Sequence, residues 1–405
     1  MKWSFMKKKM NIRYKRGWLW VFLALLCWGC RKSEPIVPEP VVSDRTILVY
    51  LAADNNLESY ARKNVTDMLK GMDESAGRLV VYMDSRKDVP VLMTMEKRRG
   101  EWTLDTLERY GEENAASPEV LRRVANRVRE LYPASSYGLI LGSHGTGWIP
   151  GGVQFPGQRM ARLKAVDAPL TRSFGEDANR GNGADRNTGM EVADLVEAIP
   201  GGFHFILFDA CLMANVEIAY ALRHKTEYII ASPAEILVDG FPYQKIMPLL
   251  WGGEPELKKA CREFRDYYEY HSYGGAWCSG TISLIRTEFL DDLAWQVKTV
   301  LDGKTEAVAG MVPSAVRRYP LIEYNQDVFF DLGAFVRELA SESEYGRFEA
   351  VLEQAVYRLA TTRFNGTDFP TDQYSGLTVY IPLSRWSSAN EKYADLEWYW
   401  YVYGK

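Results

Sequence analysis

The chain has 405 residues, a net charge of −4 and an isoelectric point near 5.8. Hydrophobic residues make up 47% of it and charged residues 25%, a balance typical of globular proteins rather than disordered chains. The charge shows no basic excess, so we expect no nucleic-acid partner. The length suits one large domain or two ordinary ones.

Residues 1–30 differ from the rest of the chain. Lysines and arginines crowd the start and are followed by the apolar run GWLWVFLALLCWGC. This order predicts a secretory signal, and the run is shorter than the about 20 apolar residues of a membrane-spanning helix. Gly29-Cys30 resembles the end of a bacterial lipoprotein signal with Cys30 as the lipidated residue, although Cys27 stands where Leu is usual. A plain signal peptide or a short anchor is the alternative.

The next segment is rich in proline. RKSEPIVPEPVVSD predicts a tether over residues 31–45, leading to a domain that spans residues 46–405. We therefore expect an exported protein of the cell envelope, either an outer-membrane lipoprotein held by an N-terminal lipid anchor or a secreted protein. The domain has three cysteines, Cys211, Cys261 and Cys278, none at CxxC spacing. An odd number argues against a disulfide framework and leaves at least one free thiol.

Strand and helix patterns alternate along the first part of the domain. Continuous apolar runs predict buried strands at 46–54, 78–85, 137–145, 203–210 and 227–235. Helical spacing of apolar residues predicts helices at 117–133, 187–200 and 215–224. Residues 91–108 alternate about a central Arg-Gly and predict a hairpin. Apolar strands that alternate with helices predict an α/β fold, a mainly parallel sheet with helices on both faces.

The C-terminal third is more helical. Helices are expected at 255–271, 288–301 and 343–362. Two further strand patterns, at 279–286 and 375–383, would extend the same sheet or form a small satellite. We expect one domain with helical C-terminal elaborations.

Two of the predicted strands end in reactive side chains. One strand ends at Ser143-His144-Gly145 and the other ends at Asp209-Ala210-Cys211. Ligands of open α/β sheets bind beyond the carboxyl ends of the strands, so His144 and Cys211 face each other if the strands are neighbours. A base or a helix N-terminus makes a thiol a useful nucleophile, and we expect Cys211 to have both, with a helix starting near Leu212. Backbone N–H groups of Gly145 and Cys211 are candidates to hold an oxyanion.

Each of these residues has a simpler interpretation. A lone His after a strand is usually a turn residue, and a lone Cys is usually a small buried hydrophobe. The presence of both, at equivalent strand ends, favours catalysis.

Two acids are candidates to bind substrate. Asp209 shares a strand face with Cys211, and a buried carboxylate there would pair with a guanidinium and reject neutral side chains. Its alternative role is to cap a helix beginning at Leu212. Asp239, in EILVDGFPY, is the second candidate, and a turn Asp before Gly240 is the alternative.

The segments LILGSHGTGW and ILFDACLMANVEIAYAL resemble the His and Cys blocks of the clostripain family of cysteine peptidases, which share the caspase-like fold. ILVYLAADNNLE, RSFGED and SGLTVYIP extend the resemblance over about residues 44–400. It implies that Cys211 is the nucleophile, that His144 is the general acid/base and that Gly145 contributes to the oxyanion hole. It also implies protein or peptide substrates cleaved after Arg or Lys, with Asp209 reading the basic side chain, and no required cofactor.

The segment at 150–190, between the two blocks, is rich in glycine and arginine and has no periodicity. Long exposed loops are natural proteolysis sites, and the resemblance implies maturation by internal cleavage between the blocks. We expect a zymogen whose loop covers the cleft until it is cut. EDANRGNGADRN at 176–187 is a candidate calcium loop that lacks EF-hand spacing, with a solvated loop as the alternative.

Two other classes of function stay open. One is a non-catalytic surface lipoprotein on the same fold, and the other is a glycan-binding one, which the 13% aromatic content permits. Most aromatic residues lie in core-like patterns, however, and no paired-carboxylate motif stands out. The motifs GxSxG, GxxxxGK[ST] and HExxH are absent from the sequence.

Overall fold

The computed structural model describes residues 43–73, 77–150, 153, 174–175, 189–271, 278–314, 316–321, 326–364, 367–369, 371 and 374–404. These residues belong to one compact unit, Val41–Lys405. The predicted signal at 1–30, with Cys30, and the candidate calcium loop at 176–187 lie outside them. None of the helices in this part of the chain is both long and apolar enough to cross a membrane.

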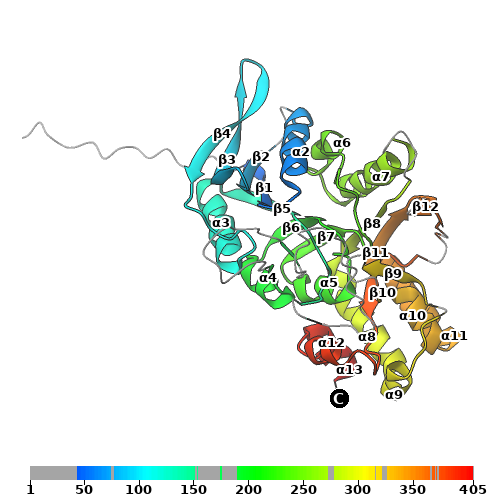
Figure 1. Cartoon of the computed structure of the whole chain (residues 1–405). Helices are drawn as coiled ribbons and strands as arrows, with labels where there is room; N and C mark the ends of the chain where they lie inside the picture. The colour runs from blue at the N-terminus through cyan, green and yellow to red at the C-terminus, as the bar shows by residue number, and fades with distance from the viewer. Residues whose placement is uncertain are drawn as a thin grey trace, which may run out of the picture. The chain divides into compact units, whose positions relative to one another are not determined.

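A nine-stranded sheet forms the centre of the unit (Figure 1). Its strands are β1 (Ser43–Ala53), β2 (Arg78–Ser85), β3 (Asp88–Arg98), β4 (Glu101–Arg109), β5 (Ala134–Gly142), β6 (Phe203–Asp209), β7 (Thr226–Ala231), β8 (Thr281–Arg286) and β11 (Val356–Ala360). They are ordered β11-β8-β7-β6-β5-β1-β2-β3-β4. The central strands β2, β1, β5, β6 and β7 pair in parallel, and antiparallel pairing is confined to the two edges. The predicted mainly parallel α/β sheet is confirmed.

Strand β1 shows why helices cover both faces of the sheet. Ile47 and Val49 point into one apolar cluster, whereas Leu48 and Tyr50 point into the other, because successive side chains of a strand face opposite ways. All four are at most 3% exposed, and burying one such side chain contributes about 1.5–3 kcal/mol.

Each cluster is completed by helices from one side of the sheet. The first receives α2 (Glu58–Lys70), α6 (Tyr243–Ile246) and α7 (Glu254–Tyr270). The second receives α3 (Pro118–Leu131), α4 (Val192–Ala198), α5 (Val216–Leu222) and α8 (Leu290–Leu301). Figure 1 shows the two groups on opposite faces of the sheet.

The predicted hairpin is strands β3 and β4. Arg98 pairs with Glu101, so the turn has two residues. Arg99 and Gly100 both have positive φ, 54° and 90°. A two-residue turn of the type that matches strand twist requires this conformation, which Gly100 adopts without strain.

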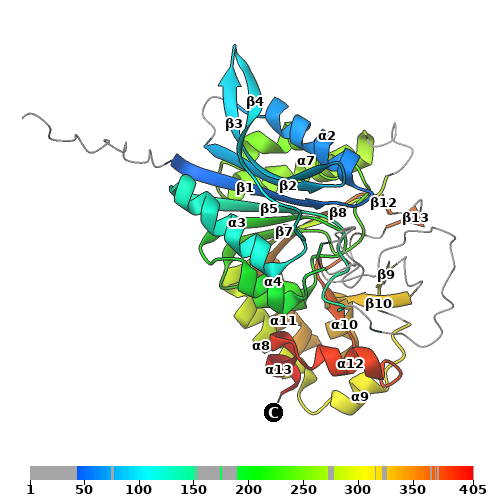
Figure 2. The same ribbon diagram turned by 60° about the vertical axis from the view of Figure 1, so that its left-hand side comes forward.

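The C-terminal strands follow both of the expected routes. Strand β8 joins the large sheet, whereas β14 (Thr378–Tyr380) lies in a separate three-stranded sheet with β10 (Gln326–Asp331) and β9 (Arg318–Leu321). The helical elaborations are α9 (Thr305–Ala309), α10 (Leu332–Leu339), α11 (Glu342–Ala355), α12 (Ser387–Tyr393) and α13 (Glu397–Tyr403). Figure 2 shows α13 beside α8, away from the edge formed by β3 and β4.

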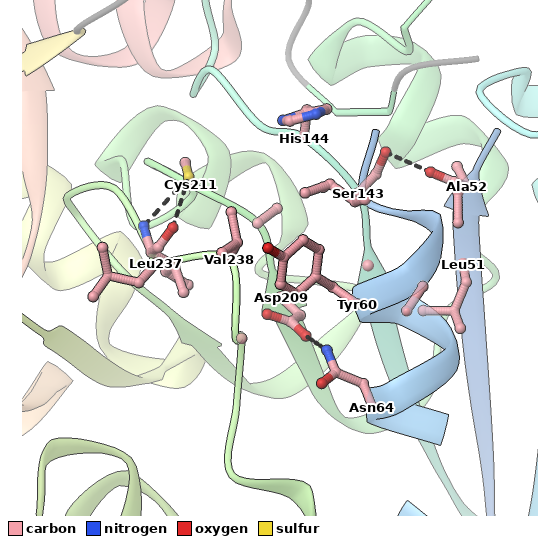
Figure 3. Close-up of a pocket in the computed structure, with 17 residues that line it drawn as sticks. Leu51, Ala52, Tyr60, Asn64, Ser143, His144, Asp209, Cys211, Leu237 and Val238 are labelled. Carbon is pink, nitrogen blue, oxygen red and sulfur yellow. Dashed lines mark hydrogen bonds between the residues drawn. The ribbon is translucent and has the colours of Figure 1, made fainter. Parts of the chain in front are cut away.

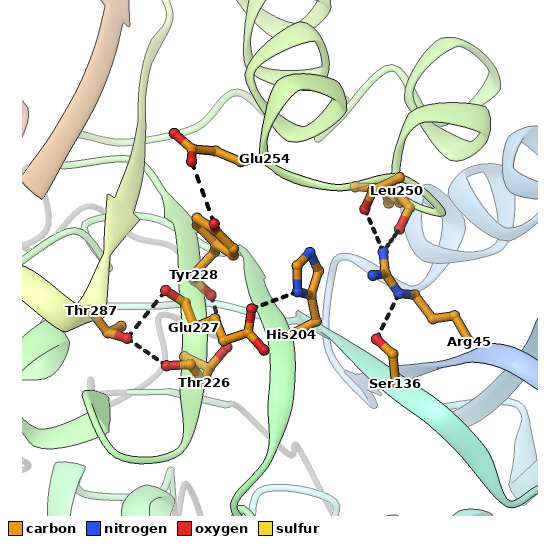
Figure 4. Close-up of polar contacts among 10 residues, drawn as sticks. Arg45, Ser136, His204, Thr226, Glu227, Tyr228, Leu250, Glu254 and Thr287 are labelled. Carbon is orange, nitrogen blue, oxygen red and sulfur yellow. Dashed lines mark hydrogen bonds and ion pairs between the residues drawn. The ribbon is translucent and has the colours of Figure 1, made fainter.

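Polar contacts fix the end of the sheet where the parallel strands begin (Figure 4). Arg45 of β1 donates hydrogen bonds to the carbonyl oxygens of Leu250, at 2.8 Å, and Gly252, at 2.7 Å. His204 of β6 places Nδ1 2.9 Å from Glu227 Oε2. His204 is thus part of the structural end of the sheet, opposite to the strand ends that carry His144 and Cys211.

Candidate active site

The pairing of β5 with β6 brings the two predicted reactive segments together. Gly142 and Asp209, the last residues of the two strands, are register partners in a parallel ladder. His144 and Cys211 each follow two residues later, so they emerge side by side at the carboxyl edge of the sheet. Both line one pocket, together with Asp209 (Figure 3). The condition on which the sequence-based prediction depended, that the strands are neighbours, is met.

The pocket has a volume of about 110 Å³ and mixed walls. Its apolar surface comes from the end of β1, from helix α2 and from the segment after β7. The residues concerned are Leu51, Ala52, Ala53, Leu57, Tyr60, Ala61, Ile236, Leu237 and Val238. Asn64 and Asp209 add polar groups. A mainly apolar cleft with a few convergent polar groups is the usual form of a ligand site.

Asp209 is the acid of this pocket. Tyr243 donates its hydroxyl hydrogen to Oδ2 at 2.9 Å, and Asn64 Nδ2 donates to the same oxygen at 3.4 Å. Burial raises the pKa of Asp209 to about 6, and the hydrogen bonds from Tyr243 and from the backbone of Phe241 oppose this rise. A cationic partner would stabilise the ionised form of this carboxylate, which burial disfavours.

The chain does not enter a helix directly after Cys211. Leu212 has a φ of 60°, in the left-handed region, which is incompatible with a right-handed helix at this residue. Helix α5 begins only at Val216, with Asn215 as its N-cap residue. The expectation that a helix N-terminus near Leu212 stabilises the thiolate is therefore wrong. The alternative interpretation of Asp209 as a helix cap is wrong for the same reason.

The Cys211 sulfur is turned toward the backbone of Ile236. The Ile236 N–H donates to Sγ at 3.3 Å, and the thiol donates to the Ile236 carbonyl oxygen at 3.6 Å. Burial raises the pKa of Cys211 to about 12, with the Ile236 N–H opposing the rise. The thiol is neutral in this arrangement, and neither of its hydrogen bonds is to His144.

His144 has the properties of a base. Burial lowers its pKa, so the ring is neutral at pH 7. Nε2 lies 2.7 Å from Oδ1 of Asn56, which belongs to the loop between β1 and α2. In the sequence, the only signal for Asn56 is its place in the stretch AADNNLE, which resembles the clostripain family. Its contact with His144 could not be predicted, because the two residues are far apart along the chain.

Gly145 brings the two reactive loops into direct contact. A Cβ at this position would lie 2.6 Å from the Cys211 carbonyl oxygen, so only glycine fits. Gly145 also bridges to Phe174, and Gly175 N donates to the His144 carbonyl oxygen at 3.1 Å. The contribution of Gly145 to an oxyanion hole stays a prediction.

Asp239 does not line the pocket. Its neighbours Val238 and Gly240 do, and Gly240 N donates to the Leu237 carbonyl oxygen at 2.9 Å, closing a four-residue turn. The carboxylate of Asp239 instead helps to raise the pKa of Lys63, after the larger effect of Asp67 on that lysine. This placement favours the turn interpretation over a role as a second pocket acid.

The profile of the clostripain family matches residues 49–402. The chain belongs to the clostripain family. Clostripain of Hathewaya histolytica is 26% identical over 239 residues, which cover 51% of this chain and 42% of that protein. The chain thus spans less than half of the length of this curated relative.

Two solved structures of family members support the assignment. An inactive zymogen of a C11 protease from Parabacteroides distasonis has a TM-score of 0.75 and 33% identity, covering 90% of this chain and 99% of the other. A secreted C11 cysteine protease from Bacteroides thetaiotaomicron, in complex with an irreversible peptide inhibitor, has a TM-score of 0.72 and 29% identity, covering 89% and 99%. The caspase-like α/β fold expected from the sequence is confirmed.

Members of this clostripain family are cysteine proteases and need no cofactor. Within the part of the chain that the structure describes, no group of three or more His, Cys, Asp or Glu is arranged to hold a metal. Cys211, Cys261 and Cys278 are all free, and Cys261 is 1% exposed within the core. Cys211 alone among the three lines the pocket.

Asn215 links the loop that follows His144 to the small C-terminal sheet. Its Oδ1 accepts a hydrogen bond from Trp148 N at 2.9 Å, and its Nδ2 donates to Thr378 Oγ1 at 2.6 Å. Asn215 is fully buried. The loop that carries His144 is thereby fixed to the small C-terminal sheet, a link that sequence spacing does not reveal.

Proposed function

We infer that this protein is a cysteine endopeptidase that cleaves peptide bonds after Arg or Lys, with Cys211 as nucleophile and His144 as general acid/base. The observation that carries the proposal is that Cys211, His144 and the carboxylate of Asp209 line one pocket at the ends of two paired strands. Membership of the clostripain family supports it, as does the irreversible peptide inhibitor bound by the relative from Bacteroides thetaiotaomicron.

The proposed reaction begins when the thiol leaves Ile236 and turns toward His144. The imidazole accepts the thiol proton while Sγ attacks the carbonyl carbon of the substrate, and the carbonyl oxygen becomes an oxyanion held by backbone N–H groups. Imidazolium then protonates the leaving amine as the C–N bond breaks. Water, deprotonated by His144, hydrolyses the thioester and restores the thiol.

Asp209 is the proposed specificity residue. Both side-chain hydrogen bonds that it accepts, from Tyr243 and Asn64, go to Oδ2. A guanidinium or ammonium entering the pocket would supply the charge partner that the poorly solvated carboxylate lacks. A neutral side chain would leave that charge buried and unpaired, which is unfavourable.

The hydrogen bonding of the Cys211 thiol to Ile236 rather than to His144 supports a latent form of the enzyme, which self-cleavage in the segment 150–190 would activate. Phe174 bridges to both Gly145 and Met190, and Gly175 donates to His144. Phe174 and Gly175 of the connecting segment are therefore joined to the backbone of Gly145 and of His144 itself. A cut in this segment would release the constraint that it places on the His loop.

We also propose that the chain is exported and is held to a membrane through lipid on Cys30. The basic and apolar leader and Gly29-Cys30 support this. Partition of the full chain into a detergent phase tests it. Cys30→Ala should move the protein to the aqueous phase, and an unchanged distribution would contradict lipidation.

Fluorogenic peptides that differ only in the residue before the cleaved bond test the activity. Arg and Lys peptides should be cleaved, a Gln peptide should not, and Cys211→Ala and His144→Ala should both be inactive. Cys261→Ala is the matched thiol control and should retain activity. Retained cleavage in Cys211→Ala would contradict the proposal.

Self-cleavage and calcium dependence need separate measurements. Intact-mass spectrometry of the wild type should show two fragments that result from a cut within residues 150–190. Cys211→Ala should stay full length. If both stay full length, self-cleavage is wrong. A calcium titration after chelation measures whether the activity depends on calcium, as a calcium site in the loop at 176–187 would predict.

A further inference from the structure

The loop between β1 and α2 presents Asn56 to the catalytic imidazole. The preceding residue builds this loop: Asn55 Nδ2 donates to the Ala52 carbonyl oxygen at 3.0 Å, and its Oδ1 accepts from Leu57 N at 2.8 Å. Asn55 is 2% exposed. Asn56 is exposed, and its Oδ1 lies 2.7 Å from Nε2 of His144. The amide is thus held at the imidazole by a buried, hydrogen-bonded neighbour.

This contact selects one tautomer of the imidazole. An amide oxygen can only accept a hydrogen bond, so its position requires the proton on Nε2. In a neutral ring the lone pair is then on Nδ1. Asn56 is not part of the pocket wall, whereas His144 and Cys211 are. Nε2 therefore faces the loop that carries Asn56, and in this tautomer the lone pair that can accept a proton is on Nδ1.

The neutral amide has a further consequence for the strength of the base. A carboxylate at this position would raise the pKa of His144 by stabilising imidazolium, as an opposite charge does. An amide orients the ring without adding charge. Burial lowers the pKa of His144, so the ring stays neutral and able to accept a thiol proton at pH 7.

We propose that Asn56 is a positioning residue for His144, which fixes the Nε2–H tautomer and the ring orientation and so completes a Cys–His–Asn arrangement. The proposal rests on the proposed role of His144 as the base. Asn56 is not among the residues that line the pocket with Cys211. It acts only through the imidazole, as the third group that orients the base in other enzymes with an activated nucleophile.

Kinetics of the full chain test the role of Asn56. Asn56→Ala should lower kcat by about 10²-fold, the loss expected for a misplaced catalytic group, while KM stays within about twofold. Asn56→Asp keeps an acceptor oxygen and should restore part of kcat, with the acidic limb of the pH profile moved upward because the carboxylate raises the pKa of His144. The titratable groups that line the pocket, Asp209, Cys211 and Tyr60, are the same in all variants.

Asn126→Ala is the matched control. Asn126 is an exposed asparagine of helix α3, so the substitution removes a similar amide far from the pocket. It should leave both kinetic constants unchanged. Thermal unfolding of Asn56→Ala should match the wild type, because Asn56 is exposed. A kcat within about twofold of wild type in Asn56→Ala would overturn the proposal.

Nuclear magnetic resonance of labelled histidines gives a readout that does not depend on activity. In the Cys211→Ala background, the imidazole nitrogens of His144 are assigned by comparison with His144→Gln. They should show the Nε2–H tautomer, which should be lost or mixed in Asn56→Ala. An Nδ1–H tautomer, or a spectrum that Asn56→Ala does not change, would overturn the role of Asn56. If instead His144→Ala keeps its protease activity while the tautomer responds to Asn56, the proposed function fails and the structural contact stands.

Discussion

The backbone of Gly145 lies against the carbonyl oxygen of Cys211, where a Cβ would come within 2.6 Å of that oxygen. Real Cβ atoms do not approach backbone oxygens so closely, so the two reactive loops would have to separate. We expect Gly145→Ala to lower kcat/KM by about 10²-fold through misplacement of His144 relative to Cys211. Steady-state kinetics with an Arg peptide measures the loss.

Gly111→Ala is the control for this substitution. No heavy atom lies within 4 Å of a Cβ built at Gly111, so the added methyl group should leave kcat/KM unchanged. Wild-type activity in Gly145→Ala would show that the loops adjust freely and that their close approach is not needed.

Asp209→Asn tests which acid reads the substrate. The variant keeps the shape of the side chain and removes its charge, so kcat/KM for Arg and Lys peptides should fall by at least about 10²-fold. Asp239→Asn should change kcat/KM by no more than about twofold, because Asp239 lies outside the pocket wall. The opposite ranking of the two variants would assign the specificity to Asp239.

The pKa of Asp209, raised by burial to about 6, predicts a pH dependence. In the proposed role of Asp209, only the ionised carboxylate binds a cationic side chain, so kcat/KM for an Arg peptide should rise with pH through about 6. Tyr243→Phe removes a hydrogen bond that lowers the pKa of Asp209, so the rise should move to higher pH. The pH–rate profiles of the two proteins provide the comparison, and an unchanged profile in Tyr243→Phe would contradict it.

Glu217 predicts a pH dependence of stability. It is 1% exposed, and its Oε1 accepts hydrogen bonds from Tyr380 N at 2.8 Å and from the Tyr393 hydroxyl at 3.2 Å. Burial raises its pKa from 4.5 to about 8. The folded state therefore holds the proton more tightly than the unfolded state, and this group lowers stability as pH rises from about 4.5 to about 8.

Glu217→Gln removes this titration and keeps an acceptor oxygen. Its free energy of unfolding relative to wild type should increase between pH 5 and pH 8, by about 1.4 kcal/mol for each unit of pKa difference crossed. Urea unfolding at several pH values measures this trend. Glu306→Gln, an exposed change of the same kind, is the control. A constant difference between wild type and Glu217→Gln across this range would show that Glu217 does not titrate there.

The sequence by itself determined the fold class and the two reactive segments. Continuous apolar runs at β1, β5 and β6 have one stable arrangement, a parallel sheet covered on both faces, because each strand must bury both of its sides. Residues that follow such strands must emerge at the same edge of the sheet. This is why we could expect His144 and Cys211 to meet if their strands were neighbours, and the pairing of β5 with β6 meets that condition.

Only the tertiary structure decided the contacts around these residues. Helical spacing correctly predicted a helix at 215–224, but the helix N-terminus that we also expected near Leu212 is not there. Hydrogen bonds from Leu212 to Ala234 and from Ala214 to Ser232 hold those residues outside a helix until Val216. Local helical spacing carries no information about such long-range partners. For the same reason the contacts of Asn56 with His144, of Ile236 with Cys211 and of Tyr243 with Asp209 become visible only when the chain is folded, because each joins segments that are separate along the sequence.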